Sequence, residues 1–173
     1  MHARTAMPAA LALSAALALA GCGQNAEATD PTRTTNAADA VTVSDAWVKA
    51  ADSGMSAAFG ELENTGDTDV TVVSVTSPAS TAMELHETVE DDSGEMMMQQ
   101  KEGGFTIAAG DALSLEPGGN HLMLMDLVDP IQAGDEVTFT LTFSDDSTVE
   151  FTAPAKDYSG ANENYSGEMD MDH

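Results

Sequence analysis

The sequence predicts an all-β domain, an antiparallel sandwich or barrel. Between residues 41 and 153, short runs rich in Val, Thr, Phe and Leu alternate with clusters of Gly, Pro, Asn, Asp and Ser. Such clusters form turns, and many short strands at this spacing are typical of antiparallel sandwiches and barrels. No window of useful length favours a helix, because β-branched and turn residues recur too often.

Ten strands are expected in this domain, because each run of apolar and β-branched residues stops at turn-forming residues. In order, the expected strands are residues 41–48, 55–63, 69–76, 81–89, 96–100, 105–107, 112–115, 122–128, 136–143 and 148–153. The turns that separate them include residues 64–67, 77–78, 90–94, 103–104, 117–119 and 133–135. The turn at 90–94 joins the fourth and fifth strands as a hairpin.

Both ends of the chain differ from this domain. Residues 1–21 contain Arg4 and an apolar stretch, which predicts a secretory signal peptide. It ends at Leu19-Ala-Gly-Cys22, which looks like a bacterial lipobox and predicts cleavage before Cys22, acylation of its thiol and an extracytoplasmic, membrane-anchored protein. The alternative is a chance cysteine near an ordinary cleavage site.

Two further segments are expected to be disordered. Residues 22–40 contain the lipidated cysteine and then nothing apolar larger than alanine, so they cannot bury enough surface to fold and should form a tether. The tail, residues 156–173, is acidic and rich in Gly, Ser and Asn. The predicted folded domain therefore spans residues 41–155.

Charge and cysteine content exclude several functions. The formal net charge is −25, and such a surface repels nucleic acid and anionic lipid headgroups. Cys22 is the only cysteine, so the domain has neither an intramolecular disulfide nor the thiolate that a blue-copper site or a thiol-disulfide reductase needs. Since no nucleophile elbow is visible either, we do not expect an enzyme.

Two stretches place histidine beside methionine. His86 follows Met83-Glu-Leu, and His121 opens the run His-Leu-Met-Leu-Met125. In a strand, His121 and Met123 share one face while the intervening leucine points the other way. Thioether sulfur selects soft metals, above all Cu(I), so these residues indicate a copper site rather than a zinc site.

The methionines of the hairpin arm extend this candidate site. Met96 and Met98 would share a face, and Met97, of opposite parity, is expected to be structural. The candidate Cu(I) ligands are then His86, Met98, His121 and Met123. Core packing is the alternative for any buried methionine, and we favour it for Met55 and Met83.

The tail ends in a second group of possible ligands, Met169, Met171 and His173. Short His- and Met-containing tracts can bind metal, and this one could take Cu(II) through His173 and carboxylates. The alternative is a solvated acidic end.

The order of these motifs resembles the periplasmic copper chaperones (PCu(A)C-like) associated with the copper A centre of cytochrome oxidase. The matching motifs are His86-Glu-Thr-Val89, the methionine-rich arm, Glu102–Gly110 and Leu115–Met125. The resemblance implies a cupredoxin-like Greek-key β-sandwich that binds Cu(I) near its surface through two histidines and two methionines. It also implies delivery of copper to the copper A subunit of cytochrome c oxidase or another copper acceptor.

Carried over to this sequence, the family pattern places ligands at His86, His121 and Met123. The middle methionine depends on how the intervals are counted. Counting forward from His86 gives Met97, whereas alignment through Gly103-Gly104 gives Met98, which we choose. Met96 remains an alternative because it shares a face with Met98.

The predicted function is therefore that of a membrane-anchored copper chaperone. The alternative is a noncatalytic acidic lipoprotein module for adhesion or calcium binding, suggested by the many carboxylates. No regular Asp/Asn-Gly calcium loop is visible in the sequence, which argues against calcium binding.

Overall fold

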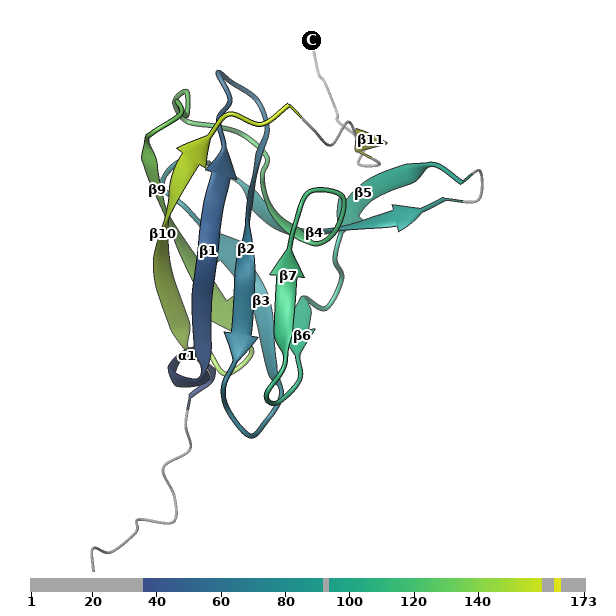
Figure 1. Cartoon of the computed structure of the whole chain (residues 1–173), viewed down its shortest axis with the longest axis vertical. Coiled ribbons are helices and arrows are strands. Elements are labelled where there is room, and N and C mark those ends of the chain that lie inside the picture. The colour runs from purple at the N-terminus through teal and green to yellow at the C-terminus, as the bar shows by residue number, and fades with distance from the viewer. Residues whose placement is uncertain (1–35, 92–93, 160–163, 166–173) are drawn as a thin grey trace, which may run out of the picture. The chain divides into compact units, whose positions relative to one another are not determined.

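The computed structural model describes residues 36–91, 94–159 and 164–165, and this part of the chain is almost entirely β-structure (Figure 1). One short helix, α1, precedes the strands. The elements are α1 (Ala37–Ala40), β1 (Val41–Lys49), β2 (Ser56–Asn64), β3 (Val70–Thr76), β4 (Met83–Glu90), β5 (Met96–Gln100), β6 (Phe105–Ile107), β7 (Ala112–Leu115), β8 (His121–Leu124), β9 (Glu136–Phe143), β10 (Thr148–Lys156) and β11 (Asn164–Tyr165).

The strands form a two-layered β-sandwich. Pairing runs in the order β11-β5-β4-β8-β2-β1-β10-β9-β3-β6, and β7 pairs with β2. Most of β10 pairs with β9, but its end pairs in parallel with β1, through Val48 opposite Ala155. Strand β10 therefore joins the two layers, and the predicted all-β sandwich is confirmed.

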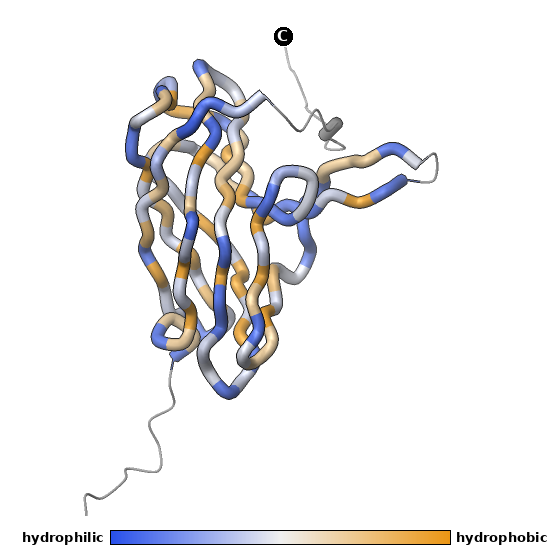
Figure 2. The backbone as a smooth tube through the Cα atoms, viewed as in Figure 1, coloured by the Kyte–Doolittle hydropathy of each residue, from blue (hydrophilic) through white to orange (hydrophobic). Residues whose placement is uncertain are grey.

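The core lies between the layers, where large apolar side chains from both are buried. Alternation along each strand puts every second residue inside, and Figure 2 shows the resulting alternation of hydrophobic and hydrophilic residues along the strands. Among the most deeply buried side chains are Leu62, Val72, Leu122, Leu124, Phe139, Leu141 and Phe143.

The ten predicted strands correspond to β1–β10, and the largest difference concerns the eighth. It was expected to reach residue 128 but ends at Leu124. Beyond it, the Asp126 N–H donates to the Ser80 hydroxyl oxygen at 3.3 Å instead of to a neighbouring carbonyl. A side chain that accepts a backbone N–H in place of a carbonyl on the neighbouring strand interrupts the regular strand pairing, so the chain continues without regular structure here.

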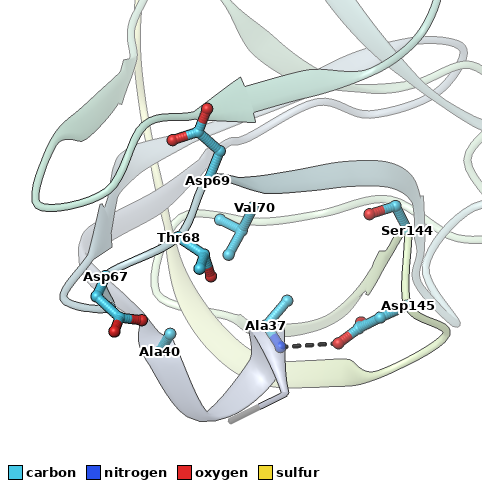
Figure 3. Close-up of a pocket in the computed structure, with 9 residues that line it drawn as sticks. Ala37, Ala40, Asp67, Thr68, Asp69, Val70, Ser144 and Asp145 are labelled. Carbon is cyan, nitrogen blue, oxygen red and sulfur yellow. Dashed lines mark hydrogen bonds between the residues drawn. The ribbon is translucent and has the colours of Figure 1, made fainter. Parts of the chain in front are cut away.

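The predicted tether ends earlier than expected. Residues 37–40 form a helical turn in which the Ala37 N–H donates to Asp145 Oδ2 at 2.9 Å (Figure 3). The Ala38 N–H donates to Ser147 Oγ at 3.0 Å. Ala40, the last residue of this turn, is buried. The predicted signal peptide, Cys22 and the rest of the tether lie outside the described residues. No helix in the described part of the chain is long and apolar enough to cross a membrane.

The predicted disordered tail also needs correction. Strand β10 continues to Lys156, and the Tyr158 ring lies 5.4 Å from that of Trp47, measured between centroids. Strand β11 then pairs in parallel with β5, opposite Met97 and Met98. Without β11, β5 would expose a row of unpaired backbone groups, and such an edge readily accepts a further strand. The proposed tail ligands Met169, Met171 and His173 lie outside the described residues.

Candidate metal centre

The two histidines singled out in the sequence lie side by side. Strands β4 and β8 are antiparallel, with His86 directly opposite His121. Their ring centroids are 5.4 Å apart and the rings are inclined at 65°. The neighbouring Leu85 and Leu122 are also opposite each other and point into the core. The histidines therefore occupy the outer face of this layer, as the alternation predicted.

Although they lie on the outer face, both histidines are buried, and the expectation of a site near the surface needs correction. His86 is 0% exposed and His121 is 2% exposed. An aromatic cover accounts for part of this. The Phe59 ring lies 6.2 Å from that of His121, and Trp47 lies 4.5 Å from Phe59, both measured between centroids.

Met123 lies on the same face as the histidines. It is one step along the strand pair from His121, opposite Glu84, and only 4% of it is exposed. On its other side, β8 pairs with β2, where Met123 is opposite Ala57. The Met123 side chain therefore lies on the face of the sheet that carries the two imidazoles, opposite to the face that carries the core leucines.

The pairing of β4 with β5 distinguishes the three consecutive methionines. His86 is opposite Gln100, Thr88 is opposite Met98, and Val89 is opposite Met97. Because directly opposite residues share a face, Met98 lies on the histidine face, diagonal to His86, and Met97 lies on the other face. Met96, opposite Glu90, shares the face of Met98 but is farther from the histidines.

Hydrogen bonds define which nitrogen of each imidazole can bind a metal. His121 Nδ1 lies 3.0 Å from the Gly119 carbonyl oxygen, which can only accept, so Nδ1 carries the hydrogen and Nε2 carries the lone pair. His86 Nε2 lies 2.7 Å from Glu84 Oε2. When Nε2 donates to this carboxylate, the lone pair of the neutral His86 ring is on Nδ1. Metal-binding histidines in proteins are typically held in this way by a carbonyl or a carboxylate.

His121 Nε2 is buried and has no hydrogen-bond partner among the described residues. Leaving a buried polar atom unsatisfied costs about 1–3 kcal/mol, so such an atom calls for a structural reason. A lone pair held in place beside a second imidazole and a thioether is suited to a metal ion.

Burial lowers the pKa of His121 below its ordinary value. The hydrogen bond to Gly119 opposes this effect, and the neighbouring His86 adds to it by charge repulsion. The neutral form, which binds metal, therefore persists to lower pH than in an exposed histidine.

The donors present favour a soft metal ion. Within the described ranges, no group of three or more His, Cys, Asp or Glu side chains is placed to hold a metal ion. The side chains that share the face of the histidine pair include thioethers, and a set of imidazoles and thioethers suits Cu(I) better than Zn(II) or Ca(II). A separate pocket of about 230 Å³ is lined by α1 and carboxylates such as Asp67 and Asp145, at the end of the sandwich away from the β4–β5 hairpin (Figures 1 and 3). It contains no histidine or methionine.

Three residues around the histidines were not predicted to matter. Glu84 is two residues before His86 and Gly119 is two residues before His121, so strand alternation could have pointed to Glu84 and sequence proximity to Gly119. Phe59 had no such signal, since its position depends on the pairing of β2 with β8.

Residues 41–155 match the family described as "Putative lipoprotein LpqE-like". The chain belongs to the LpqE-like family. It is 50% identical over 151 residues to "Putative lipoprotein Lxx21020" of Leifsonia xyli subsp. xyli, which covers 87% of this chain and 90% of that protein.

Solved structures of PCuAC domains share the fold of this LpqE-like chain. The apo PCuAC domain from PmoF1 matches with a TM-score of 0.59 and 20% identity, covering 69% of this chain and 95% of that domain. DR1885 from Deinococcus radiodurans matches in its apo form with a TM-score of 0.53 and 27% identity, covering 89% of this chain and 96% of DR1885. Its Cu(I) form matches with a TM-score of 0.50 and 28% identity, covering 69% and 81%. The similarity to the periplasmic copper chaperone family is confirmed.

Proposed function

We propose that this LpqE-like protein is an extracytoplasmic copper chaperone that binds one Cu(I) ion through His86, His121, Met123 and Met98. The observation that carries the proposal is the buried histidine pair, in which His121 Nε2 presents its lone pair on the face that also holds the thioethers. The Cu(I) form of DR1885, a structural neighbour, supports the choice of metal.

The donor set suits a carrier. Two neutral imidazoles and two thioethers add no negative charge, so they favour Cu(I) over Cu(II) and over hard cations. Glu84 and the Gly119 carbonyl would hold the imidazoles, and Nδ1 of His86 and Nε2 of His121 would be the atoms that bind the metal. Such a site binds and releases an ion by ligand exchange and requires no catalytic group, so we expect no enzymatic activity.

Among the three consecutive methionines, the strand register favours Met98. Met97 is on the opposite face, and Met96 is two residues farther toward the hairpin tip. Met98 and Met123 lie on opposite diagonals of His86, one beside Thr88 and one beside Glu84. Both can bind one ion only if their side chains converge over the imidazoles, which the flexible, unbranched methionine side chain allows.

Localisation and delivery are the remaining parts of the proposal. The lipobox-like Leu19-Ala-Gly-Cys22 supports a lipid anchor at Cys22. The relative from Leifsonia xyli, which is 50% identical, is named "Putative lipoprotein Lxx21020". We propose the copper A subunit of cytochrome c oxidase, or another copper acceptor, as the recipient. A secondary Cu(II) site at Met169, Met171 and His173 stays a prediction from the sequence.

An anaerobic Cu(I) titration against a competing chelator tests the metal site. We would use the whole chain from residue 22, with Cys22→Ser to remove its thiol, and titrate Cu(II), Zn(II) and Ca(II) in parallel. We expect one tightly bound Cu(I), lost in the His121→Ala variant. Clear Ca(II) binding without Cu(I) binding would instead establish the alternative, an acidic lipoprotein module.

Deletion of residues 166–173 tests the tail separately, since it leaves β11 in place. Loss of a weaker Cu(II) equivalent with unchanged Cu(I) binding would support the secondary site. Unchanged stoichiometry for both ions would refute it.

A further inference from the structure

Three of the four donors proposed for copper are too deeply buried to meet the ion first, and the fourth, Met98, is only partly exposed. His86, His121 and Met123 are 0%, 2% and 4% exposed. A Cu(I) ion arrives bound to another carrier, and it transfers by exchanging one ligand at a time. The first ligand on this protein must therefore be a soft donor that reaches solvent.

Among the described methionines, Met96 meets this requirement best. It is 46% exposed, and every other methionine that the structure describes is partly or fully buried. Exposure of a methionine on a strand is unusual for a packing residue, because methionine normally fills gaps in a core. At 46% exposure the Met96 side chain contributes little to packing, and a Cu(I) ion in solvent can reach it.

The register places Met96 in line with the site. Along β5, Met96 is opposite Glu90, Met98 is opposite Thr88, and Gln100 is opposite His86. All six of these residues share one face, so Met96 and Met98 form a row of thioethers with a step of two residues, about 6.5–7 Å. The row begins near the tip of the hairpin that projects from the sandwich (Figure 1), and Figure 2 shows a hydrophobic run along β5 there.

Charge at the tip also favours a cation. Glu90, directly opposite Met96, and Glu95, its neighbour in the chain, are both exposed. Exposed carboxylates raise the local concentration of cations without binding Cu(I) strongly, since Cu(I) prefers sulfur.

We infer that Met96 is a transient Cu(I) ligand, through which the ion passes on its way to and from the buried histidine pair. The inference rests on the proposed copper-binding function and extends it to a route. Copper would pass from the ligands of the donor carrier to the Met96 sulfur, then to Met98, and then to the imidazoles. The ion would stay Cu(I) throughout, and each step would exchange one metal–ligand bond for another.

A transient ligand has a kinetic signature that differs from that of a resident ligand. It stabilises only the intermediate on the route, so its removal slows loading and release by the same factor and leaves the dissociation constant unchanged. Loss of a resident ligand raises the dissociation constant.

The test compares three variants of the whole chain from residue 22, each with Cys22→Ser. Met96→Leu removes the proposed transient ligand, Met97→Leu is the matched control on the opposite face, and Met98→Leu removes the proposed resident ligand. Stopped-flow spectroscopy with a coloured Cu(I)–chelator complex measures loading, and excess chelator measures release. We expect both rates to fall about tenfold in Met96→Leu, with the dissociation constant and thermal unfolding unchanged.

Each other result would overturn the inference in a recognisable way. Unchanged rates in Met96→Leu would show that the ion enters elsewhere. A raised dissociation constant with an unchanged loading rate would make Met96 a resident ligand. If the parent chain itself bound no Cu(I), the proposed function would fail, and the inference with it, whereas either of the first two results leaves the function standing.

Discussion

His86 and His121, which are 35 positions apart in the sequence, lie directly opposite each other on β4 and β8, and their ring centroids are 5.4 Å apart. Each ring is held by a hydrogen bond from one nitrogen, to Glu84 in one case and to the Gly119 carbonyl in the other. The pair is therefore positioned before any metal binds, and its immediate neighbours are the best targets for mutation.

Glu84→Gln should weaken Cu(I) binding without unfolding the protein. The carboxylate holds the His86 ring at 2.7 Å, and loss of such a partner typically costs 10–100-fold in metal affinity. Competition titration with a chelator measures the effect. Glu87→Gln is the matched control, because Glu87 lies on the other face of the same strand and pairs with Lys101 at 2.6 Å. Equal Cu(I) affinity in the Glu84→Gln variant and the parent would show that Glu84 does not position His86 for metal binding.

Met123→Leu should separate metal binding from packing. Leucine has a similar volume, so the substitution should change the free energy of unfolding by less than about 1.5 kcal/mol. The thioether is lost, however, and Cu(I) affinity should fall at least tenfold if sulfur is a ligand. Met125→Leu, just beyond the end of β8, serves as the control. Identical affinities for both variants and the parent would mean that Met123 only packs.

The stability of the metal-free protein should decrease as the pH falls below about 6.5. Burial lowers the pKa of His121 in the folded state, so the unfolded chain takes up a proton at a higher pH than the folded chain does. The stabilisation is complete above the unfolded-state pKa and is lost progressively as the pH falls toward the folded-state pKa. Urea unfolding between pH 5 and 7.5 measures it, and a His121→Leu variant should show a smaller decrease. An equal decrease in that variant would assign the effect to other groups.

Asn64→Ala should destabilise the sandwich and leave the metal site intact. Asn64 is 0% exposed, and its side-chain nitrogen lies 2.9–3.1 Å from the carbonyl oxygens of Thr68, Ile107 and Ala108. Its side-chain oxygen accepts a hydrogen bond from the Gly66 N–H at 3.0 Å. Removal leaves several buried backbone groups unpaired, at a cost of about 3 kcal/mol. Denaturant unfolding gives the loss, and a change below about 0.5 kcal/mol would contradict this account.

The sequence alone was sufficient to predict ten of the strands, though not all of their ends, and the faces of their side chains. Strand alternation is local, so Leu122 and Leu124 could be assigned to one face and His121 and Met123 to the other before any pairing was known. The candidate donor types also follow from the sequence, because His and Met close together, without cysteine, favour a soft metal ion such as Cu(I).

Burial and register depended on tertiary structure. The sequence left Met96, Met97 and Met98 open, because the face that each presents to His86 depends on how many residues the turn between β4 and β5 takes up. The aromatic cover of the histidines required the pairing of β2 with β8, which brings Phe59 beside His121. The ends of the domain likewise required contacts with distant residues, such as Ala37 with Asp145 and β11 with β5.

Local propensity thus determined what each strand is and which side chains share a face. Pairing between distant strands decided which candidate donors share a face and how deeply the two histidines are buried. The physical reason is that these properties arise from contacts whose partners are far apart in the chain, and a periodic pattern within one strand carries no information about the strand beside it.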